Sequence, residues 1–121
     1  MNGKILIVDD DRFYSVYLCR LLEKGFPDYE LITAKNGEEA WQILNQGTWN
    51  NVSDILILDL EMPVLNGYGL LKLMGKTNRE FPRVVVNSNY KLRKQDLVDA
   101  PPFASTLKPL NFSKVEHALR S

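Results

Sequence analysis

Apolar residues follow two alternating patterns along the chain. Continuous runs rich in Ile, Leu and Val are typical of buried parallel strands, and five segments have this character: residues 4–8, 29–34, 54–58, 83–88 and, more weakly, 103–107. Between these runs, apolar residues recur three and four positions apart, which is typical of a helix with one buried face. The stripes begin near Phe13, Ala40, Leu70 and Phe112. Strands that alternate with helices predict an α/β protein whose parallel sheet is joined by right-handed crossovers.

Polar residues at the expected positions support these helices. Asn36, Asn66 and Asn111 each precede a stripe, where the asparagine side chain can accept a hydrogen bond from a free backbone N–H group. Asp11 fits the same position before the first helix, whose predicted buried stripe is Phe13, Val16, Tyr17 and Leu21. The segment 90–100 is the weakest predicted helix, because its apolar residues form no single face and two prolines follow it.

The composition narrows the range of functions. A chain of 121 residues is long enough for one domain with its own core. Lysine plus arginine and aspartate plus glutamate balance at 15 each, so no overall charge attracts nucleic acid or an anionic membrane. The single cysteine, Cys19, excludes an internal disulfide, and the first ten residues hold no apolar run long enough for a signal peptide or a membrane span. We therefore expect a cytoplasmic protein.

Three acidic residues follow the two most apolar runs. Asp9 and Asp10 come directly after residues 4–8, and Asp59 comes directly after residues 54–58. In a doubly wound sheet, functional groups gather at the carboxyl ends of the strands, so these carboxylates converge if the two strands are neighbours. Like charges at close range need a cation or a proton. A site with only oxygen ligands and no paired histidine or cysteine favours Mg²⁺.

A lysine completes this group of charges. Lys108 follows the fifth predicted strand, and three carboxylates, one Mg²⁺ and one ammonium sum to zero, so the site can accept a phosphoryl group. A carboxylate attacks phosphorus when a metal and a lysine screen the incoming charge, and the product is an acyl phosphate. Asp59, at the end of the central strand, is the candidate nucleophile. Met62, Pro63 and Gly67 allow the backbone after it to bend.

The motifs ILIVDD, LILDLEMPVLNG and LKP, in this order, resemble those of the response regulator receiver domains of two-component signalling, and the resemblance covers essentially the whole chain. It implies a flavodoxin-like (βα)5 doubly wound parallel sheet with strand order 2-1-3-4-5, and one receiver domain over residues 1–121. It also implies that Asp59 is the phosphoacceptor and that Lys108 contacts the phosphate. Mg²⁺ would be bound by Asp9, Asp10, Asp59 and the backbone carbonyl of Glu61.

The resemblance further implies partners and a mode of action. The phosphoryl group would come from a phosphohistidine of a histidine kinase or phosphotransfer protein, and the switched surface would contact a downstream protein or a fused output domain. The domain itself would bind neither nucleic acid nor a membrane. It would not be an enzyme acting on another substrate, because it catalyses only its own phosphorylation and autodephosphorylation. The only histidine, His117, lies in the last predicted helix, away from the acids.

Two positions depart from the family pattern. Asn87 occupies the place of a hydroxyl residue at the end of the fourth strand, and Ser88 is the neighbouring alternative. Adjacent strand residues face opposite ways, so only one of them can serve. Ser105 stands where the family has an aromatic switch residue, and Phe103 lies on the same face as its possible replacement. These departures leave a second interpretation, a degenerate receiver that acts as a phosphorylation-independent interaction module.

Two other classes of protein fit less well. An aspartyl phosphatase carries a second aspartate two residues after the nucleophile, whereas this chain reads DLEM. A flavin-binding domain needs a phosphate loop rich in Gly, Ser or Thr, whereas this chain has DDDRF after the first strand.

The polar loop before the third strand contains Trp49, which either folds back on its own helix or anchors a partner.

Overall fold

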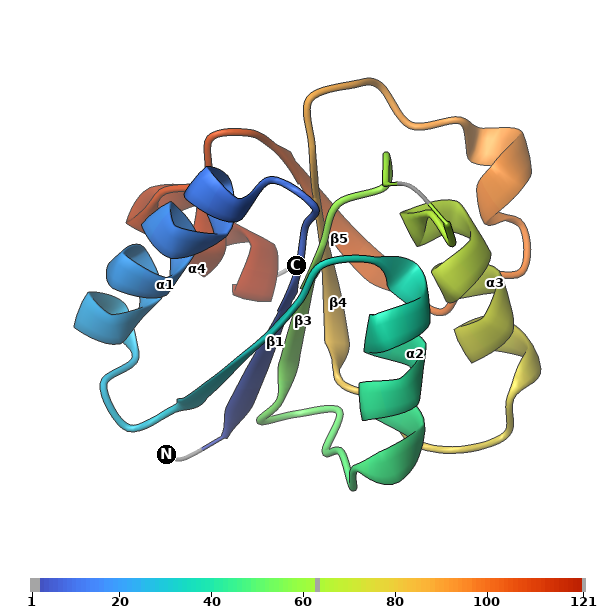
Figure 1. Cartoon of the computed structure of the whole chain (residues 1–121), viewed down its shortest axis with the longest axis horizontal. Helices are drawn as coiled ribbons and strands as arrows, with labels where there is room; N and C mark the ends of the chain where they lie inside the picture. The colour runs from blue at the N-terminus through green and yellow to red at the C-terminus, as the bar shows by residue number, and fades with distance from the viewer. Residues whose placement is uncertain (1–2, 63, 121) are drawn as a thin grey trace.

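A single parallel sheet forms the centre of the protein (Figure 1). The computed structural model describes residues 3–62 and 64–120. The strands lie in the order β2-β1-β3-β4-β5, which confirms the predicted flavodoxin-like arrangement. Each strand agrees with its predicted run to within one residue at either end. The bounds are β1 Lys4–Val8, β2 Glu30–Ala34, β3 Ile55–Leu58, β4 Arg83–Ser88 and β5 Phe103–Leu107.

Within the described residues, four α-helices cover the two faces of the sheet (Figure 1). Helices α1 (Arg12–Gly25) and α4 (Phe112–Arg120) lie on one face, and α2 (Gly37–Gln46) and α3 (Gly67–Lys76) lie on the other. The predicted caps are confirmed, because the side chains of four residues accept hydrogen bonds from backbone N–H groups in the first turns: Asp11, Asn36, Asn66 and Asn111.

The fourth crossover contains no α-helix among its described residues. It has a single 3₁₀ turn, η1 (Lys94–Leu97), which has no side-chain cap and buries only Leu97. The poor apolar pattern of residues 90–100 is the physical reason, because a longer helix would have had no face to bury. The chain after η1 packs directly on α3, where a Cβ atom at Gly75 would lie 1.6 Å from the Asp99 carbonyl oxygen.

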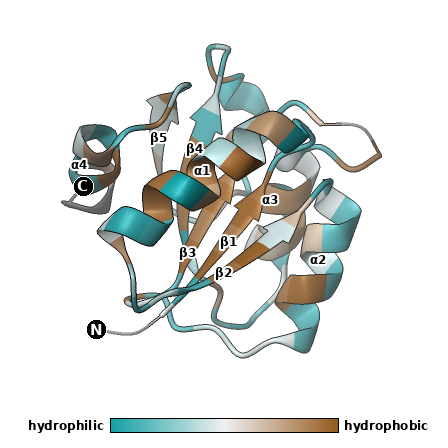
Figure 2. Cartoon of the chain, turned by 60° about the vertical axis from the view of Figure 1, so that its left-hand side comes forward, coloured by the Kyte–Doolittle hydropathy of each residue, from teal (hydrophilic) through white to brown (hydrophobic). Residues whose placement is uncertain are grey.

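The strands β1 and β3 are buried on both faces, and apolar residues fill all of β3 and all of β1 after Lys4 (Figure 2). Their side chains alternate between two core clusters. Ile5, Ile7 and Ile57 pack toward α1 and α4, whereas Leu6 and Leu58 pack toward α2 and α3. This double burial explains why the sequence shows continuous apolar runs rather than alternation.

The buried face of α1 differs from the predicted stripe. Phe13 is 88% exposed, and Val16 and Tyr17 are also exposed, whereas Leu18 and Leu22 are fully buried. Apolar residues surround much of this helix, so their spacing alone does not determine which face meets the sheet.

Trp49 folds back on its own helix, which confirms the first of the two alternatives. Its indole N–H donates to the carbonyl of Leu44 in α2 at 2.9 Å, and only 5% of the residue is exposed. The Lys4 ammonium lies 4.1 Å from the ring centroid.

The described helices are all too short or too polar to cross a lipid bilayer.

Candidate functional site

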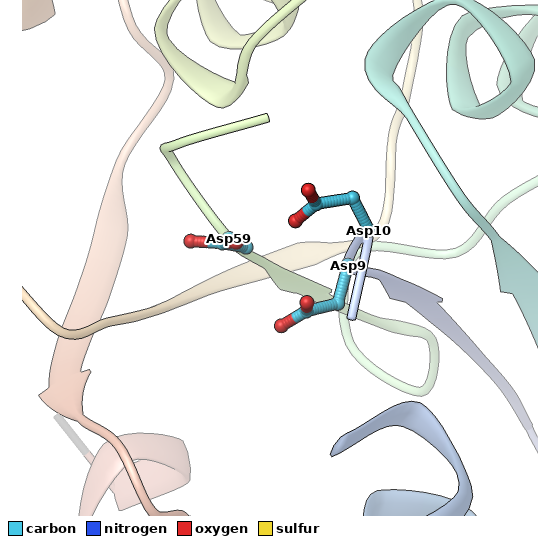
Figure 3. Close-up of side chains that lie close together, drawn as sticks. All are labelled: Asp9, Asp10 and Asp59. Carbon is cyan, nitrogen blue, oxygen red and sulfur yellow. The ribbon is translucent and has the colours of Figure 1, made fainter. Parts of the chain in front are cut away.

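The register of the central strands brings the three acids to one edge of the sheet. Val8 pairs with Leu58, so Asp9 and Asp59 follow the paired residues side by side. The Asp59 N–H donates to the Val8 carbonyl at 2.9 Å, which continues the ladder to this level. Carboxylate oxygens of Asp9, Asp10 and Asp59 lie within 4.8 Å of one another and point the same way (Figure 3). The prediction that these carboxylates converge is therefore confirmed.

Lys108 reaches this cluster from the end of β5. Its Nζ lies 2.7 Å from Asp9 Oδ2 and 3.5 Å from Asp59 Oδ2. Its backbone N–H donates to the Ser88 carbonyl at 3.0 Å, which fixes the chain at this point. Asp9 and Asp59 are buried and Asp10 is exposed, so the cluster opens to solvent on one side.

Burial and the neighbouring charges shift the pKa values of Asp59 and Lys108. Burial and the negative charge of Asp9 raise the pKa of Asp59 to about 6, although Lys108 and the Glu61 N–H oppose this shift. Burial lowers the pKa of Lys108, but its hydrogen bond to Asp9 and the charges of both carboxylates outweigh this effect and raise it overall. Lys108 is thus an ammonium at neutral pH, and the cluster carries a formal charge of −2 when all three acids are ionised.

This cluster fits a hard divalent cation. Its donor atoms are all carboxylate oxygens, and its exposed member Asp10 lies at the solvent side. One divalent cation would neutralise the formal charge of −2 that the three carboxylates and Lys108 carry together. The backbone of Glu61 lies beside the cluster, because its N–H donates to Asp59 Oδ1 at 3.2 Å. The role of the Glu61 carbonyl stays a prediction.

The loop after Asp59 turns back on the site. The Gly67 N–H donates to the Leu60 carbonyl at 3.0 Å, and a Cβ atom at Gly67 would lie 2.5 Å from the Asp59 carbonyl oxygen. Only glycine allows this approach. Met62 is buried, and Pro63, also expected to shape the bend, lies outside the described residues.

Asn87 and Ser88 occupy opposite faces of β4, as predicted. Val86 pairs with Leu58, so Asn87 lies at the level of Asp59 and on the same face of the sheet. Its Oδ1 accepts a hydrogen bond from the Tyr14 hydroxyl. Ser88 points to the other face, where its Oγ accepts from the Tyr90 N–H at 3.3 Å. The register therefore favours Asn87 as the residue beside Asp59.

Ser105 and Phe103 share one face of β5, as predicted, but at different levels. Ser105 pairs with Val86, near the site, and lines a groove of about 290 Å³ together with Ser88 and Tyr90. Phe103 pairs with Val84, nearer the other end of the sheet, and packs against the core on the α3 side. A switch role for either residue stays a prediction.

Two side chains near the site were not predicted from the sequence. Tyr14 in α1 contacts Asn87 through its hydroxyl, and the Lys108 Nζ lies 4.5 Å from its ring centroid. Arg93 places its Nη1 3.7 Å from Glu61 Oε1 and its guanidinium 4.3 Å from the centroid of the Tyr68 ring. No motif marks either residue, because both contacts join segments far apart in the sequence.

The raised pKa of Asp59 predicts a pH dependence in the metal-free protein. The pKa is about 6 in the folded chain and has its ordinary value of 3.8 in the unfolded chain. The folded state therefore holds this proton more tightly, so the stabilising contribution is complete below the lower value and is lost as pH rises through the higher one. Unfolding by urea in EDTA should show wild type losing about 1 to 3 kcal/mol relative to Asp59→Asn between about pH 4 and about pH 8. Parallel pH profiles for the two proteins would contradict this expectation.

Comparison with known proteins adds independent information. A family model for the response regulator receiver domain matches residues 5–120. The transcriptional regulatory protein CpxR of Escherichia coli (strain K12) is 40% identical over 78 residues, which are 64% of this chain and 30% of that protein. The two-component response regulator-like APRR7 of Arabidopsis thaliana is 33% identical over 88 residues, or 71% of this chain and 12% of that protein. The chain thus spans under a third of the length of these two relatives.

Solved structures agree with this similarity. The bacteriophytochrome response regulator AtBRR matches with a TM-score of 0.81 at 26% identity, covering 99% of this chain and 91% of that one. The response regulator TrrA of Thermotoga maritima, solved in complex with Mg(2+)-BeF, matches with a TM-score of 0.79 at 26% identity, covering 98% of this chain and 96% of that one.

Proposed function

The chain belongs to the response regulator receiver domain family of two-component systems, and from this premise we propose that it is a phosphoacceptor. It takes a phosphoryl group from a phosphohistidine of a partner histidine kinase or phosphotransfer protein onto Asp59, in a Mg²⁺-dependent reaction. The observation that carries this proposal is the cluster of Asp9, Asp10, Asp59 and Lys108 at the carboxyl ends of the central strands and β5.

Each residue of the cluster has a separate role in this proposal. The Asp59 carboxylate attacks phosphorus: an O–P bond forms while the N–P bond of the phosphohistidine breaks, and its electron pair returns to the imidazole. Lys108 neutralises charge on the phosphoryl oxygens, and the Asn87 amide donates a hydrogen bond to them. Asp9, Asp10, Asp59 and the Glu61 carbonyl would hold Mg²⁺. Bound Mg²⁺ would screen the negative charge between the carboxylates and the incoming phosphoryl group.

The site favours Asp59 over Asp9 as the nucleophile. Asp9 is occupied, because its Oδ1 accepts from the Asp11 N–H at 2.8 Å and its Oδ2 lies 2.7 Å from the Lys108 ammonium. Asp59 has longer contacts, at 3.2 Å to the Glu61 N–H and 3.5 Å to the ammonium. Its oxygens are therefore held less tightly, and its raised pKa makes it more basic than a carboxylate in water.

We also propose that phosphorylation of Asp59 changes the surface around β4 and β5. The new charge on Asp59 shifts the population of conformations at the surface around β4 and β5, where Ser105 and Phe103 lie, and a downstream protein or output domain reads that change. The chain works as one cytoplasmic receiver domain over residues 1–121, and it catalyses no reaction other than its own phosphorylation and dephosphorylation.

Intact mass after incubation with acetyl phosphate tests the metal dependence. We expect one added phosphoryl group per chain with Mg²⁺ and none with EDTA, because the cluster without a cation repels the anionic donor. Calcium, with its longer and less regular coordination, serves as the matched ion and should support a slower reaction. Equal labelling in EDTA, or no labelling with Mg²⁺, would contradict the proposal.

Ser105 supports a second candidate function. With a serine in place of an aromatic residue, position 105 has no large side chain to move between two positions, so the chain can also be interpreted as an interaction module that does not respond to phosphorylation. A partner that binds wild type and Asp59→Asn equally, with or without acetyl phosphate, would favour this function.

A further inference from the structure

The Tyr14 hydroxyl lies between two parts of the site. It is the donor in a hydrogen bond to Asn87 Oδ1, and it accepts a hydrogen bond from the Leu110 N–H at 2.9 Å. Leu110 comes two residues after Lys108, so the tyrosine joins the ends of β4 and β5 to α1. Burial raises the pKa of Tyr14 to about 12, opposed in part by the Leu110 N–H. The hydroxyl therefore keeps its proton at neutral pH.

The direction of these bonds fixes the orientation of the Asn87 amide. A backbone N–H can only donate, so the Tyr14 oxygen must accept from Leu110. The single hydroxyl proton is directed to Asn87 Oδ1, so the amide oxygen faces Tyr14 and the NH₂ group is turned away from it. Asn87 Nδ2 makes one long bond, 3.4 Å to the Thr106 carbonyl. Among the residues that the structure describes, the Thr106 carbonyl is the one acceptor bonded to this NH₂ group, so its second proton is available to another acceptor.

This orientation matters because an amide has two unlike ends. A phosphoryl oxygen accepts hydrogen bonds and repels a carbonyl oxygen, so only the NH₂ end of Asn87 can serve it. A serine or threonine hydroxyl can rotate to donate, whereas an asparagine must be held the right way round. Asn87 lies level with Asp59 and on the same face of the sheet. With its oxygen bonded to Tyr14, the part of this side chain that can donate to a phosphoryl group on Asp59 is the NH₂ group.

We propose that Tyr14 is a positioning residue for phosphoryl transfer, which holds Asn87 with its NH₂ group as the donor at the site. This inference rests on the proposed function of Asp59 and deepens it, because it names the side chain that makes an asparagine competent at this position. The ring of Tyr14 has a separate contact with the Lys108 ammonium, at 4.5 Å from its centroid. A phenylalanine at position 14 retains that contact and removes only the hydroxyl.

The test compares Tyr14→Phe with Tyr17→Phe. Tyr17 is one turn along α1, and its hydroxyl donates to the Leu110 carbonyl at 2.5 Å, so the control also removes a bond to the same residue but leaves Asn87 untouched. We expect Tyr14→Phe to slow labelling by acetyl phosphate and Mg²⁺ about five- to tenfold, the loss typical of one neutral hydrogen bond. Tyr17→Phe should label at the wild-type rate.

Two further readouts separate positioning from a loss of structure. If Tyr14 acts through Asn87, the double variant Tyr14→Phe, Asn87→Ala should label no more slowly than Asn87→Ala alone. In the metal-free protein, the side-chain NH₂ signals of Asn87 in an amide NMR spectrum should shift in Tyr14→Phe and not in Tyr17→Phe.

Each outcome decides the matter. Wild-type labelling in Tyr14→Phe, equal slowing in both tyrosine variants, or additive losses in the double variant would overturn the role of Tyr14 while leaving Asp59 as the acceptor. A wild-type protein that takes up no phosphoryl group would overturn the proposed function, and the positioning role with it.

Discussion

Replacing Asp59 with asparagine is expected to abolish phosphoryl transfer while leaving the fold intact. Asparagine is nearly the same size, but its amide is not a nucleophile toward phosphorus, so labelling should fall below detection rather than merely slow. The substitution also removes a buried charge that Asp9 repels, and the raised pKa of Asp59 implies that the metal-free variant unfolds at higher urea than wild type near neutral pH. Intact mass and urea unfolding measure the two effects.

Asp54→Asn is the matched control for this variant. Asp54 is as buried as Asp59 but lies just before β3, at the other end of the sheet, where its Oδ1 accepts from the Lys4 N–H at 2.8 Å and its Oδ2 from the Asn50 N–H at 2.7 Å. Asparagine satisfies only one of these N–H groups, so this variant should lose about 1 to 3 kcal/mol of stability yet label normally. Full labelling of Asp59→Asn, or none of Asp54→Asn while it stays folded, would contradict the assignment.

Replacing Lys108 with methionine should lower the rate of phosphoryl transfer about 100- to 1,000-fold, the size expected when a preorganised charge at the reacting group is removed. Lys108 is the cation that contacts both Asp9 and Asp59, and methionine retains most of its aliphatic chain. Its loss leaves two buried carboxylates without their nearest positive charge, so the pKa of Asp59 should rise further in the metal-free protein. Timed mass measurements at saturating Mg²⁺ give the rate.

Lys114→Met is the comparison that separates this effect from a change in the loop. The Lys114 ammonium donates to the carbonyl groups of Leu107 and Pro109, on either side of Lys108, at 3.0 and 2.9 Å. It holds the same stretch of chain, whereas the ion pairs with Asp9 and Asp59 among the described residues are made by Lys108. Equal losses in the two variants would show that Lys108 acts only by shaping the loop, and an unfolded Lys108→Met would undo the prediction.

The sheet and its acidic edge could be predicted because they depend on local patterns. Runs that are buried on both faces leave a continuous apolar signal, and the first polar residue after each run marks a strand end. Asp9 and Asp59 could therefore be identified as candidate site residues from the sequence. The parallel register of β1 with β3 then places them side by side. The weak pattern of residues 90–100 likewise indicated a segment with little helix, and a single 3₁₀ turn is present there.

Side chains that meet across the fold could not be predicted in the same way. The α1 sequence offers apolar and aromatic residues on more than one face, and the predicted stripe ran through Phe13 and Tyr17, whereas the buried face contains Leu18 and Leu22. Only the packing on the sheet selects the second, which turns Tyr14 toward Asn87. The choice between Asn87 and Ser88 needed the same information, because it depends on the register of β3 with β4.

The most direct test of the central claim is to locate the phosphoryl group itself. After labelling with acetyl phosphate and Mg²⁺, borohydride reduces an acyl phosphate to an alcohol, so a phosphorylated aspartate becomes homoserine and survives proteolysis for peptide mass mapping. We expect homoserine at position 59 and at no other aspartate. Homoserine at Asp9 or Asp10 instead, or a stable phosphate that borohydride leaves in place, would contradict that claim.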